Sequence, residues 1–308
     1  MANVIPDDID FSEYLRETSV RVKVRKASIY KTSLLNYFFP PIDAEKPKGM
    51  LSTKLSGLIH FRPGEVTVWS GYNGHRKSMF VGQMVLDLCV QNQQTLLASF
   101  EMLPTHTLAR MTRQCFAIAS PSEWAIHTFA RWTDDKLWLF DHLGRINPQQ
   151  VIAVMRYFAS ELEGKHVVID SMMMVCASEE SLDEQKQFMT DLVRTAQETG
   201  LHIHLVAHCR KPLDESKPPT KYDLRGSAAL SDQAHNVVTV WANKAKIAKL
   251  EIDPGDSTAL ALPDALVAVE KQRNGVFEGR IKLWFDDASL RFVNNRTAVV
   301  EPYVLSEC

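Results

Sequence analysis

Short apolar runs of strand length alternate with helix-length segments from Gly64 onward, and this pattern limits the folds open to the chain. The strand-like runs are Glu65–Ser70, Thr95–Phe100, Lys136–Phe140, His166–Asp170, His202–His208, Asn236–Trp241, Ala265–Lys271 and Arg280–Phe285. The helix-length segments between the earlier runs are Ser78–Gln91, Thr105–Ala119, Pro148–Glu163 and Leu182–Thr199. Strands separated by helices form parallel sheets covered on both faces. The last strands follow one another without a helix. We therefore predict an α/β fold with a mainly parallel central sheet flanked by helices and antiparallel strands at one edge.

The composition excludes several classes of protein. The 308 residues are 45% hydrophobic, which is too apolar for a mainly disordered chain. No apolar run approaches the ~18 residues of a membrane span, and the acidic N-terminus does not resemble a signal peptide. The five cysteines form no Cys-x-x-Cys pair, so neither a disulfide framework nor a zinc site is expected. We expect a reduced, cytoplasmic protein without membrane contact. Its net charge of −2 still allows a local basic groove.

The first fifty residues differ from the rest of the chain. An acidic start is followed by a basic run, Arg21–Lys26, and by a break at Pro40-Pro41. We expect residues 1–50 to form an N-terminal arm or linker with a short helix near Phe11–Arg16, and residues 51–308 to form one domain.

A glycine-containing loop joins the strand Glu65–Ser70 to the next helix, and it reads Gly71-Tyr-Asn-Gly-His-Arg-Lys-Ser78. In this arrangement backbone amides and the helix N-terminus face the phosphates of a nucleotide. Lys77 would reach the β- and γ-phosphates, and Ser78 would ligate Mg²⁺. The alternative is an ordinary strand–turn–helix connection whose lysine and serine are solvated. The nucleotide-binding residues predicted here are Gly71, Asn73, Gly74, His75, Arg76, Lys77, Ser78 and Met79.

One position departs from the phosphate-loop pattern. The residue before the lysine is normally glycine, and this chain has Arg76. Its side chain could crowd the phosphates, force an unfavourable backbone conformation, or point outward without harm. Nucleotide binding or turnover would be weakened in the first two cases.

Three polar residues follow apolar strands at the edge where ligands bind in such sheets. They are Glu101, Asp170 and His208. Asp170 is suited to hold Mg²⁺ and Glu101 to polarise an attacking water, while His208 could sense the terminal phosphate or touch DNA. Taken singly, each could instead cap a helix or pack in the core.

A polar segment after His208 carries cations and prolines. Its cations could follow the backbone of a single-stranded nucleic acid, and its Gly226-Ser227 pair would let the backbone approach a phosphate. The alternative is a solvated loop. The DNA-binding residues predicted here are Arg210, Lys211, Lys217, Lys221, Arg225, Gly226 and Ser227.

Eight motifs in one order carry a family resemblance. They are Gly64-Glu65-Val-Thr-Val, the Gly71–Ser78 loop, Leu86–Cys89, Thr95–Met102, Val167–Asp170, His204–Lys211, Arg225–Ala228 and Lys271–Gly275. Together they resemble the helicase domain of the Twinkle-type mitochondrial helicase and the phage primase–helicases, within the DnaB-like group. The resemblance extends from about Leu51 to Phe292 and implies a RecA-like P-loop NTPase core.

The resemblance also implies roles for single residues. Lys77 and Ser78 match the nucleotide-binding pair, Glu101 the catalytic glutamate and Asp170 the magnesium-associated aspartate. His208 matches the residue that links the γ-phosphate to the DNA-binding loop. Lys271 and Arg273 match the finger that enters the neighbouring subunit's site; the alternative is a pair of exposed charges on an edge strand.

The family's partners follow from the same resemblance. It implies ATP or a dNTP as substrate with Mg²⁺, single-stranded DNA in the channel of a homo-oligomeric, hexameric ring, and a primase or polymerase as partner. The arm would correspond to a linker helix that packs on the next subunit through Phe11, Tyr14 and Leu15, or else to a loosely ordered tail. No primase domain fits in residues 1–50.

We therefore expect a ring-forming, ATP-dependent DNA helicase that translocates on single-stranded DNA in phage-type replication, within a bacterial host cell. Two alternatives stay open. One is a RecA-like or KaiC-like ATPase that binds DNA without unwinding it. The other is a catalytically weakened DNA-binding ring or loader subunit, which Arg76 would permit.

Overall fold

A ten-stranded sheet runs through the molecule in the order β1-β4-β3-β5-β6-β2-β7-β8-β9-β10. The computed structural model describes residues 3–4, 12, 14, 26–39, 41, 48–176, 181–212 and 214–304. The strands are β1 (Asn3–Val4), β2 (Val66–Ser70), β3 (Thr95–Ser99), β4 (Leu137–Leu139), β5 (His166–Asp170), β6 (His202–Val206), β7 (Asn236–Ala242), β8 (Ala265–Gln272), β9 (Gly279–Asp286) and β10 (Arg291–Val293). Neighbouring strands from β1 to β7 pair in parallel. The pairs β7–β8, β8–β9 and β9–β10 are antiparallel. The expected α/β fold with an antiparallel edge is confirmed.

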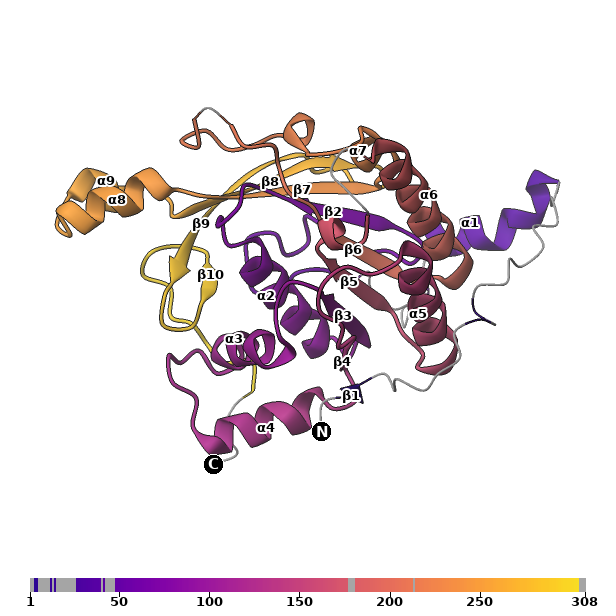
Figure 1. Cartoon of the computed structure of the whole chain (residues 1–308), viewed down its shortest axis with the longest axis horizontal. Coiled ribbons are helices and arrows are strands. Elements are labelled where there is room, and N and C mark those ends of the chain that lie inside the picture. Colours follow the sequence, from indigo (N-terminus) through magenta and orange to yellow (C-terminus); the bar gives the residue numbers. More distant parts are fainter. Residues whose placement is uncertain are drawn as a thin grey trace.

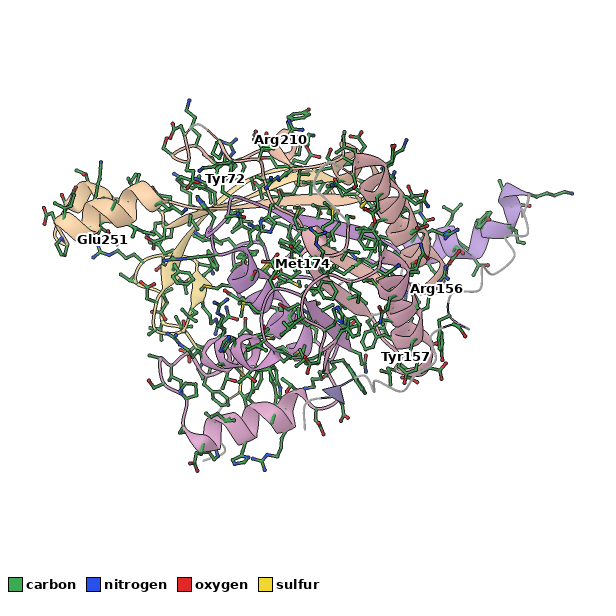
Figure 2. All side chains as sticks on the ribbon, viewed as in Figure 1. Tyr72, Arg156, Tyr157, Met174, Arg210 and Glu251 are labelled. Atoms are coloured by element: carbon green, nitrogen blue, oxygen red, sulfur yellow. The ribbon has the colours of Figure 1, made fainter. Side chains whose placement is uncertain are left out.

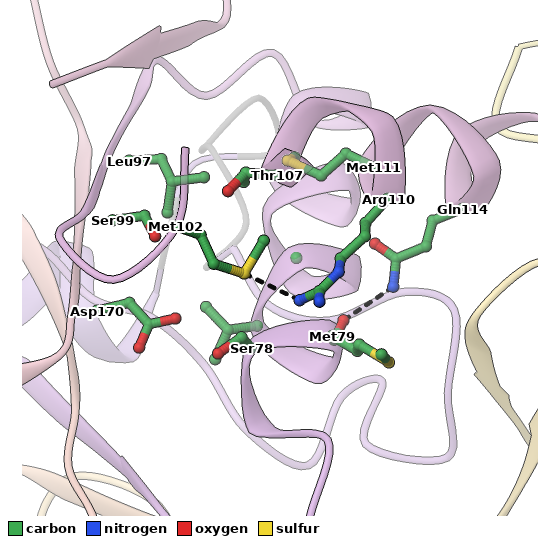
Figure 3. Close-up of a pocket in the computed structure, with 12 residues that line it drawn as sticks. Ser78, Met79, Leu97, Ser99, Met102, Thr107, Arg110, Met111, Gln114 and Asp170 are labelled. Atoms are coloured by element: carbon green, nitrogen blue, oxygen red, sulfur yellow. Dashed lines mark hydrogen bonds between the residues drawn. The ribbon is translucent and has the colours of Figure 1, made fainter. Parts of the chain in front are cut away.

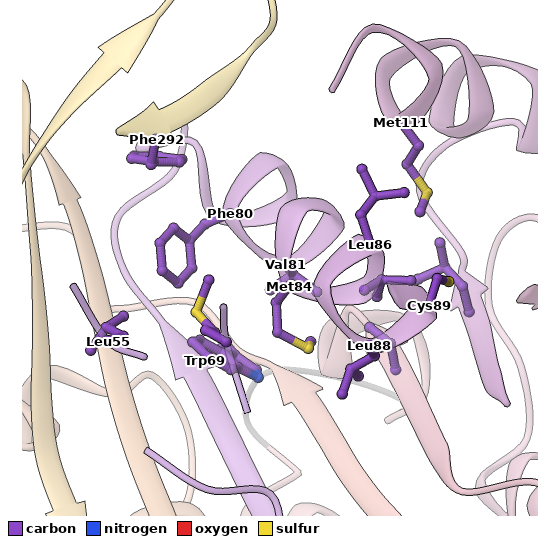
Figure 4. Packing of buried hydrophobic residues seen from close by; sticks show 14 of the residues in the cluster. Leu55, Trp69, Phe80, Val81, Met84, Leu86, Leu88, Cys89, Met111 and Phe292 are labelled. Carbon is purple, nitrogen blue, oxygen red and sulfur yellow. The ribbon is translucent and has the colours of Figure 1, made fainter. Parts of the chain in front are cut away.

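Helices cover both faces of the parallel part of the sheet (Figure 1). The helices are α1 (Lys31–Phe38), α2 (Lys77–Val90), α3 (Pro104–Phe116), α4 (Glu123–Thr133), α5 (Pro148–Glu161), α6 (Leu182–Thr199), α7 (Ala229–Gln233), α8 (Lys244–Ile252) and α9 (Ser257–Ala261). One core lies between the sheet and α5–α6, and includes Phe158 and Phe188. The other lies on the face covered by α2, α3 and α4. In it Phe80 packs against Trp69 and Phe292 (Figure 4). Because successive residues of β2 face opposite sides, Val66 and Val68 enter the first core and Trp69 the second.

Several elements differ from the sequence expectation. The segment between β7 and β8 was expected to lack a helix, and this was wrong: α8 and α9 form a helical hairpin there that projects from the body (Figure 1). Side-chain caps start both helices, since Asn243 accepts from the Lys246 amide and Asp256 from the Thr258 amide. Helix α4 was also missed, and Ser122 caps it by accepting from the Ala125 amide.

Three buried histidines occupy the side of the sheet that Phe61 covers. Phe61 contacts the rings of His166, His202 and His204. The Nδ1–H of His202 donates to the Arg62 carbonyl at 2.7 Å, so its Nε2 accepts from the Thr67 hydroxyl at 2.8 Å. Burial lowers the pKa of all three imidazoles, that of His202 to about 3. These histidines are neutral core residues.

The arm of residues 1–50 is described only in part. Phe11, Leu15 and most of the basic run lie outside the described residues. Tyr14 packs edge-on against Tyr157 of α5 at 5.5 Å between ring centroids, and its carbonyl accepts from the Arg156 guanidinium at 3.0 Å (Figure 2). Helix α1 lies within this arm and was not predicted. Its large apolar side chains are exposed, as are those beside it, for example Tyr37, Phe38 and Phe39.

Among the described residues, no helix is long and apolar enough to span a bilayer. Cys89, Cys115, Cys176 and Cys209 are buried free thiols, and Cys308 lies outside the described residues.

Candidate nucleotide-binding site

The phosphate loop lies at the carboxyl end of β2 and leads directly into α2. Two of its glycines are required by the geometry. A Cβ on Gly71 would come within 2.2 Å of the Val240 carbonyl oxygen, and Gly74 has a φ of +73°. The loop therefore packs tightly on β7 while its later residues turn into the helix. The N-terminus of α2, with its unpaired amides, faces the cleft described below.

Lys77 is buried at the first position of α2, with 6% of its surface exposed. Its ammonium group donates to the carbonyls of Gly71 and Tyr72, both at 2.9 Å. An ammonium has three N–H donors, so one is left for a ligand in the cleft. Burial lowers the pKa of Lys77. The loop's own carbonyl groups thus hold the Lys77 ammonium in place before any ligand binds.

Arg76 occupies the N-cap of α2 with φ 64° and ψ 22°, which is the left-handed region. This explains why glycine is usual here, since an L-residue in that region costs about 1–2 kcal/mol. The guanidinium carbon lies 3.7 Å from the centroid of the Phe285 ring, and Nη2 lies 3.6 Å from Asp287 Oδ1. Of the three possibilities considered for Arg76, the unfavourable backbone conformation is the one seen in the structure. The side chain packs against β9 and lines the cleft.

Ser78 and Asp170 meet across the cleft, from the second residue of α2 and the last residue of β5. The Ser78 hydroxyl donates a hydrogen bond to the Asp170 carboxylate. Burial raises the pKa of Asp170, and the Ser78 hydrogen bond opposes this. Hydroxyl and carboxylate oxygens are ligands that Mg²⁺ prefers. Among the described residues no set of three or more His, Cys, Asp or Glu side chains could hold a metal alone, so a cation here would need phosphate and water oxygens as well.

Glu101 and His208 follow β3 and β6 and lie against each other. Glu101 Oε1 lies 3.6 Å from His208 Nε2 and accepts from the Ser171 hydroxyl at 2.5 Å. The contact with His208 is the main reason why the pKa of Glu101 falls to about 2. Both contacts use Oε1, so Oε2 has no hydrogen-bond partner among the described residues, and Glu101 lines the cleft. Two neighbouring carboxylates, Glu101 and Asp170, thus have pKa values shifted in opposite directions, as in sites that divide acid–base roles.

These side chains line one cleft of about 580 Å³. Its walls include six predicted nucleotide-site residues together with Glu101, Asp170 and His208. A smaller cavity beside it is lined by Ser78, Asp170, Met102 and Arg110 (Figure 3). Sequence reasoning missed Arg110 and Met173 as cleft residues, because they come from α3 and the turn after β5 and belong to no motif. His75 and Gly71 are buried and do not line the cleft.

The predicted DNA-binding residues are not all in one place. An isolated bridge between Cys209 and Leu224 closes a loop that we call the basic loop, residues 210–223. Arg210 is exposed on it (Figure 2), as are Lys211 and Lys217. Lys221 donates to the Glu270 carbonyl at 3.4 Å. Arg225 instead lines the nucleotide cleft.

Gly226 and Ser227 lie against α6. The Ser227 amide already donates to Gln185 Oε1 at 2.9 Å, and a Cβ on Gly226 would come within 2.1 Å of the same atom. The close approach expected at this pair is therefore made to a glutamine of the chain itself.

Lys271 and Arg273 lie at the opposite edge of the sheet. Because β8 runs antiparallel to β7, Gln272 pairs with Asn236, which pairs with Thr67 near the start of β2. The five residues of β2 separate that edge from the phosphate loop by about 15 Å. Lys271 Nζ donates to the carbonyls of Ser231 and Asp232, and Arg273 Nη2 donates to that of Asp232 at 3.2 Å. Neither cation reaches the cleft of its own subunit.

Comparison with known proteins agrees with this architecture. The chain is similar to a solved structure titled "ATPase Domain of G40P", with 16% identity and a TM-score of 0.66 over 88% of this chain and 99% of that one. It is also similar to a DnaB-like replicative helicase solved with a view to its interactions with primase, with 15% identity and a TM-score of 0.69 over 89% of this chain and 68% of that one. At the level of the fold, the resemblance to DnaB-like helicase ATPase domains is confirmed. A family model described as "AAA domain" matches residues 53–214, just over half of the chain, in a stretch that holds the phosphate loop, Glu101, Asp170 and His208. The chain therefore belongs to the AAA domain family.

Proposed function

We propose that the protein is a ring-forming helicase that hydrolyses ATP or a dNTP to translocate on single-stranded DNA. The observation that carries the proposal is the convergence of Lys77, Ser78, Glu101, Asp170 and His208 on one cleft. These groups supply a cation that can bind phosphates, two oxygen ligands for a metal ion, a second carboxylate and an imidazole. Together they match the requirements of phosphoryl transfer to water.

The chain's own residues would act as follows. Lys77 and the N-terminal amides of α2 hold the β- and γ-phosphates. Ser78 and Asp170 would hold Mg²⁺, which neutralises charge on the phosphates when bound. Glu101, ionised at neutral pH, accepts the proton of the attacking water at Oε2. Among the described residues the buried Nδ1 of His208 has no hydrogen-bond partner, so it can accept a hydrogen bond from a water or a ligand hydroxyl.

Hydrolysis would be completed by a neighbouring subunit. Lys271 and Arg273 lie about 15 Å from the cleft of their own chain, so a catalytic role for them requires a second copy. Arg273 uses Nη2 to hold the Asp232 carbonyl and is exposed, so its other donors are open to a phosphate of the next subunit. Such an arginine raises turnover by about 10³–10⁵ in related NTPases.

The ring itself would be built through α1. Large apolar side chains such as Leu34 and Phe38 are 55% and 67% exposed there, so the described part of the chain leaves them largely uncovered. An apolar groove of about 400 Å³ between α3 and α4, lined by Leu108, Ile126 and Phe129, lies on the other side of the body (Figure 1). A donor helix and an acceptor groove on different faces give head-to-tail contacts, which form a ring when the rotation between successive copies closes. We propose that α1 of one copy occupies this groove of the next.

The cations of the basic loop would contact single-stranded DNA in the ring's channel, and a primase or polymerase would bind the assembled ring. A second candidate is favoured by one observation. Arg76 has a left-handed backbone conformation that suits glycine, and strain at this position of the phosphate loop would weaken the ATPase. The second candidate is therefore a weakened ATPase with the same fold that serves as a DNA-binding ring or loader subunit.

The test is hydrolysis by the purified protein with and without single-stranded DNA, followed by unwinding of a forked duplex. Lys77→Ala should lose nucleotide binding. Glu101→Gln should keep binding and lose turnover by about 10²–10⁴. Parent hydrolysis that DNA does not stimulate, with DNA binding intact, would select the weakened ring. Stimulated hydrolysis without unwinding would select a RecA-like or KaiC-like ATPase.

A further inference from the structure

A carboxylate from the basic loop reaches back to the phosphate loop. Glu215 Oε2 lies 3.3 Å from His75 Nε2 and accepts from Lys244 Nζ at 2.9 Å. His75 belongs to the phosphate loop and Glu215 to the basic loop, and Lys244 is the first residue of α8. Three segments that are far apart in the sequence therefore meet at one carboxylate oxygen.

The hydrogen bonds define the charge state of this cluster. The Ala242 amide donates to His75 Nδ1 at 3.1 Å, so the proton of the imidazole sits on Nε2 and is donated to Glu215. His75 is fully buried, and burial lowers its pKa, so the ring is neutral at pH 7. Glu215 is ionised, because its bond with Lys244 lowers the pKa of the carboxyl. His75 therefore donates to the Glu215 carboxylate, and the hydrogen bond from Lys244 to the same carboxylate joins two charged groups.

Lys244 extends the link to a second point of the phosphate loop. Its Nζ also donates to the Asn73 carbonyl at 3.4 Å and lies 3.7 Å from the position of a Cβ on Gly74. The Glu215 side chain thus contacts the segment from Asn73 to His75, through the His75 ring and through Lys244, and this segment precedes Arg76 and Lys77. A shift of Glu215 would move the residues that position the phosphate-binding amides.

The backbone of the basic loop is held independently, at the residue before the loop and at Glu215 itself. The Cys209 amide donates to the Gly71 carbonyl at 3.1 Å, and the Trp241 indole donates to the Glu215 carbonyl at 2.8 Å. These backbone contacts do not depend on the Glu215 side chain. Removing the carboxylate should leave the loop folded and cut its side-chain link to His75 and Lys244.

We propose that Glu215 is a positioning residue that couples DNA contact at the basic loop to the phosphate loop. DNA bound at Arg210, Lys211 and Lys217 would shift Glu215, and through His75 and Lys244 the phosphate-loop backbone. Coupling between two binding sites is reciprocal, so nucleotide must change DNA affinity by the factor by which DNA changes nucleotide affinity. The inference rests on the proposed function, because it requires both ligands.

Three variants test the proposal. Glu215→Ala removes the acceptor, Glu215→Gln keeps an acceptor oxygen without charge, and Asp214→Ala is the matched control. Asp214 is the neighbouring exposed carboxylate and bonds only to Ser216 among the contacts described. Melting temperatures of all three check that the fold is kept. The isosteric glutamine keeps the test valid if the alanine variant is unstable.

The readouts are the ratio of DNA-stimulated to basal hydrolysis and the change in DNA affinity caused by a non-hydrolysable nucleotide. We expect Glu215→Ala to lower both ratios by about fivefold or more, Glu215→Gln to fall between it and the parent, and Asp214→Ala to match the parent. Parent-like ratios in Glu215→Ala would overturn the coupling alone. A rise in both would also overturn it, by showing that Glu215 competes with DNA for Lys244. A parent protein without DNA-stimulated hydrolysis would overturn the proposed function and the coupling together.

Discussion

Acidification should unfold this protein through its buried histidines, and His202 gives the sharpest case. Its ring is 1% exposed and uses both nitrogens, one donating to the Arg62 carbonyl and one accepting from Thr67. Protonation would place a charge in the core and a second N–H against the Thr67 hydroxyl. Burial accordingly lowers the pKa of His202 from 6.5 to about 3 in the folded chain.

The size of the effect follows from linkage. The unfolded state binds more protons than the folded state between the two pKa values, so stability is full above pH 6.5 and falls toward pH 3. At pH 5 the unfolded histidine is 1.5 pH units below its pKa of about 6.5, and each unit is worth about 1.4 kcal/mol. His202 alone should therefore lower the free energy of unfolding by about 2 kcal/mol between pH 7.5 and pH 5. This figure holds for any folded pKa well below 5.

The assay is urea unfolding at both pH values for the parent, His202→Asn and His127→Asn, at one protein concentration. The asparagine at position 202 keeps a donor for the Arg62 carbonyl and cannot titrate. It should be less stable at pH 7.5, but its stability should fall by about 2 kcal/mol less on acidification than that of the parent. His127 is exposed, so its variant should follow the parent. An equal pH dependence for the parent and His202→Asn would refute the reasoning.

Three further predictions concern the other sites. Lys217→Ala should lower the slope of log K against log salt concentration for single-strand binding by about 0.7. Lys221→Ala should lower it by less, because Lys221 is half-buried and donates to the Glu270 carbonyl. Equal slopes for the parent and both variants would place the DNA path elsewhere. At position 76, the N-cap of α2, glycine should be more stable than alanine by about 1 kcal/mol in thermal unfolding, because φ is 64°. An alanine variant as stable as the glycine variant would contradict the left-handed backbone. Phe38→Ser should weaken assembly measured by light scattering without lowering the stability of the single chain, since Phe38 is 67% exposed; an unchanged mass would exclude α1 from the interface.

The parallel core could be predicted because its strands are continuous apolar runs. The predicted ends of β2, β3, β5 and β6 lie within two residues of those in the structure. Helices α8 and α9 could not be predicted by the same means. They are short, start at side-chain caps and contribute few buried residues, so they lack a clear apolar period.

The cleft was predictable for a topological reason. Glu101, Asp170 and His208 follow β3, β5 and β6, which lie side by side next to β2, so strand-end residues meet the phosphate loop there. Residues without a motif could not be found this way. Arg110 comes from the face of α3, and Glu215 is an acid within a basic loop, where composition suggests only solvation. The Arg76 backbone conformation also required coordinates, because the sequence left open whether the side chain crowds the phosphates, strains the backbone or points outward.

The central claim is a catalytic site shared between subunits, and mixed assembly of two inactive variants tests it most directly. Arg273→Ala should bind nucleotide normally and lose turnover by about 10³-fold or more, while Glu101→Gln lacks the carboxylate that activates water. In an equal mixture, about one quarter of the interfaces would join an intact Glu101 to an intact Arg273 by random assortment. The account predicts that co-assembled mixtures recover DNA-stimulated hydrolysis up to about that fraction of the parent rate. Mixtures that demonstrably co-assemble and stay inactive would contradict it.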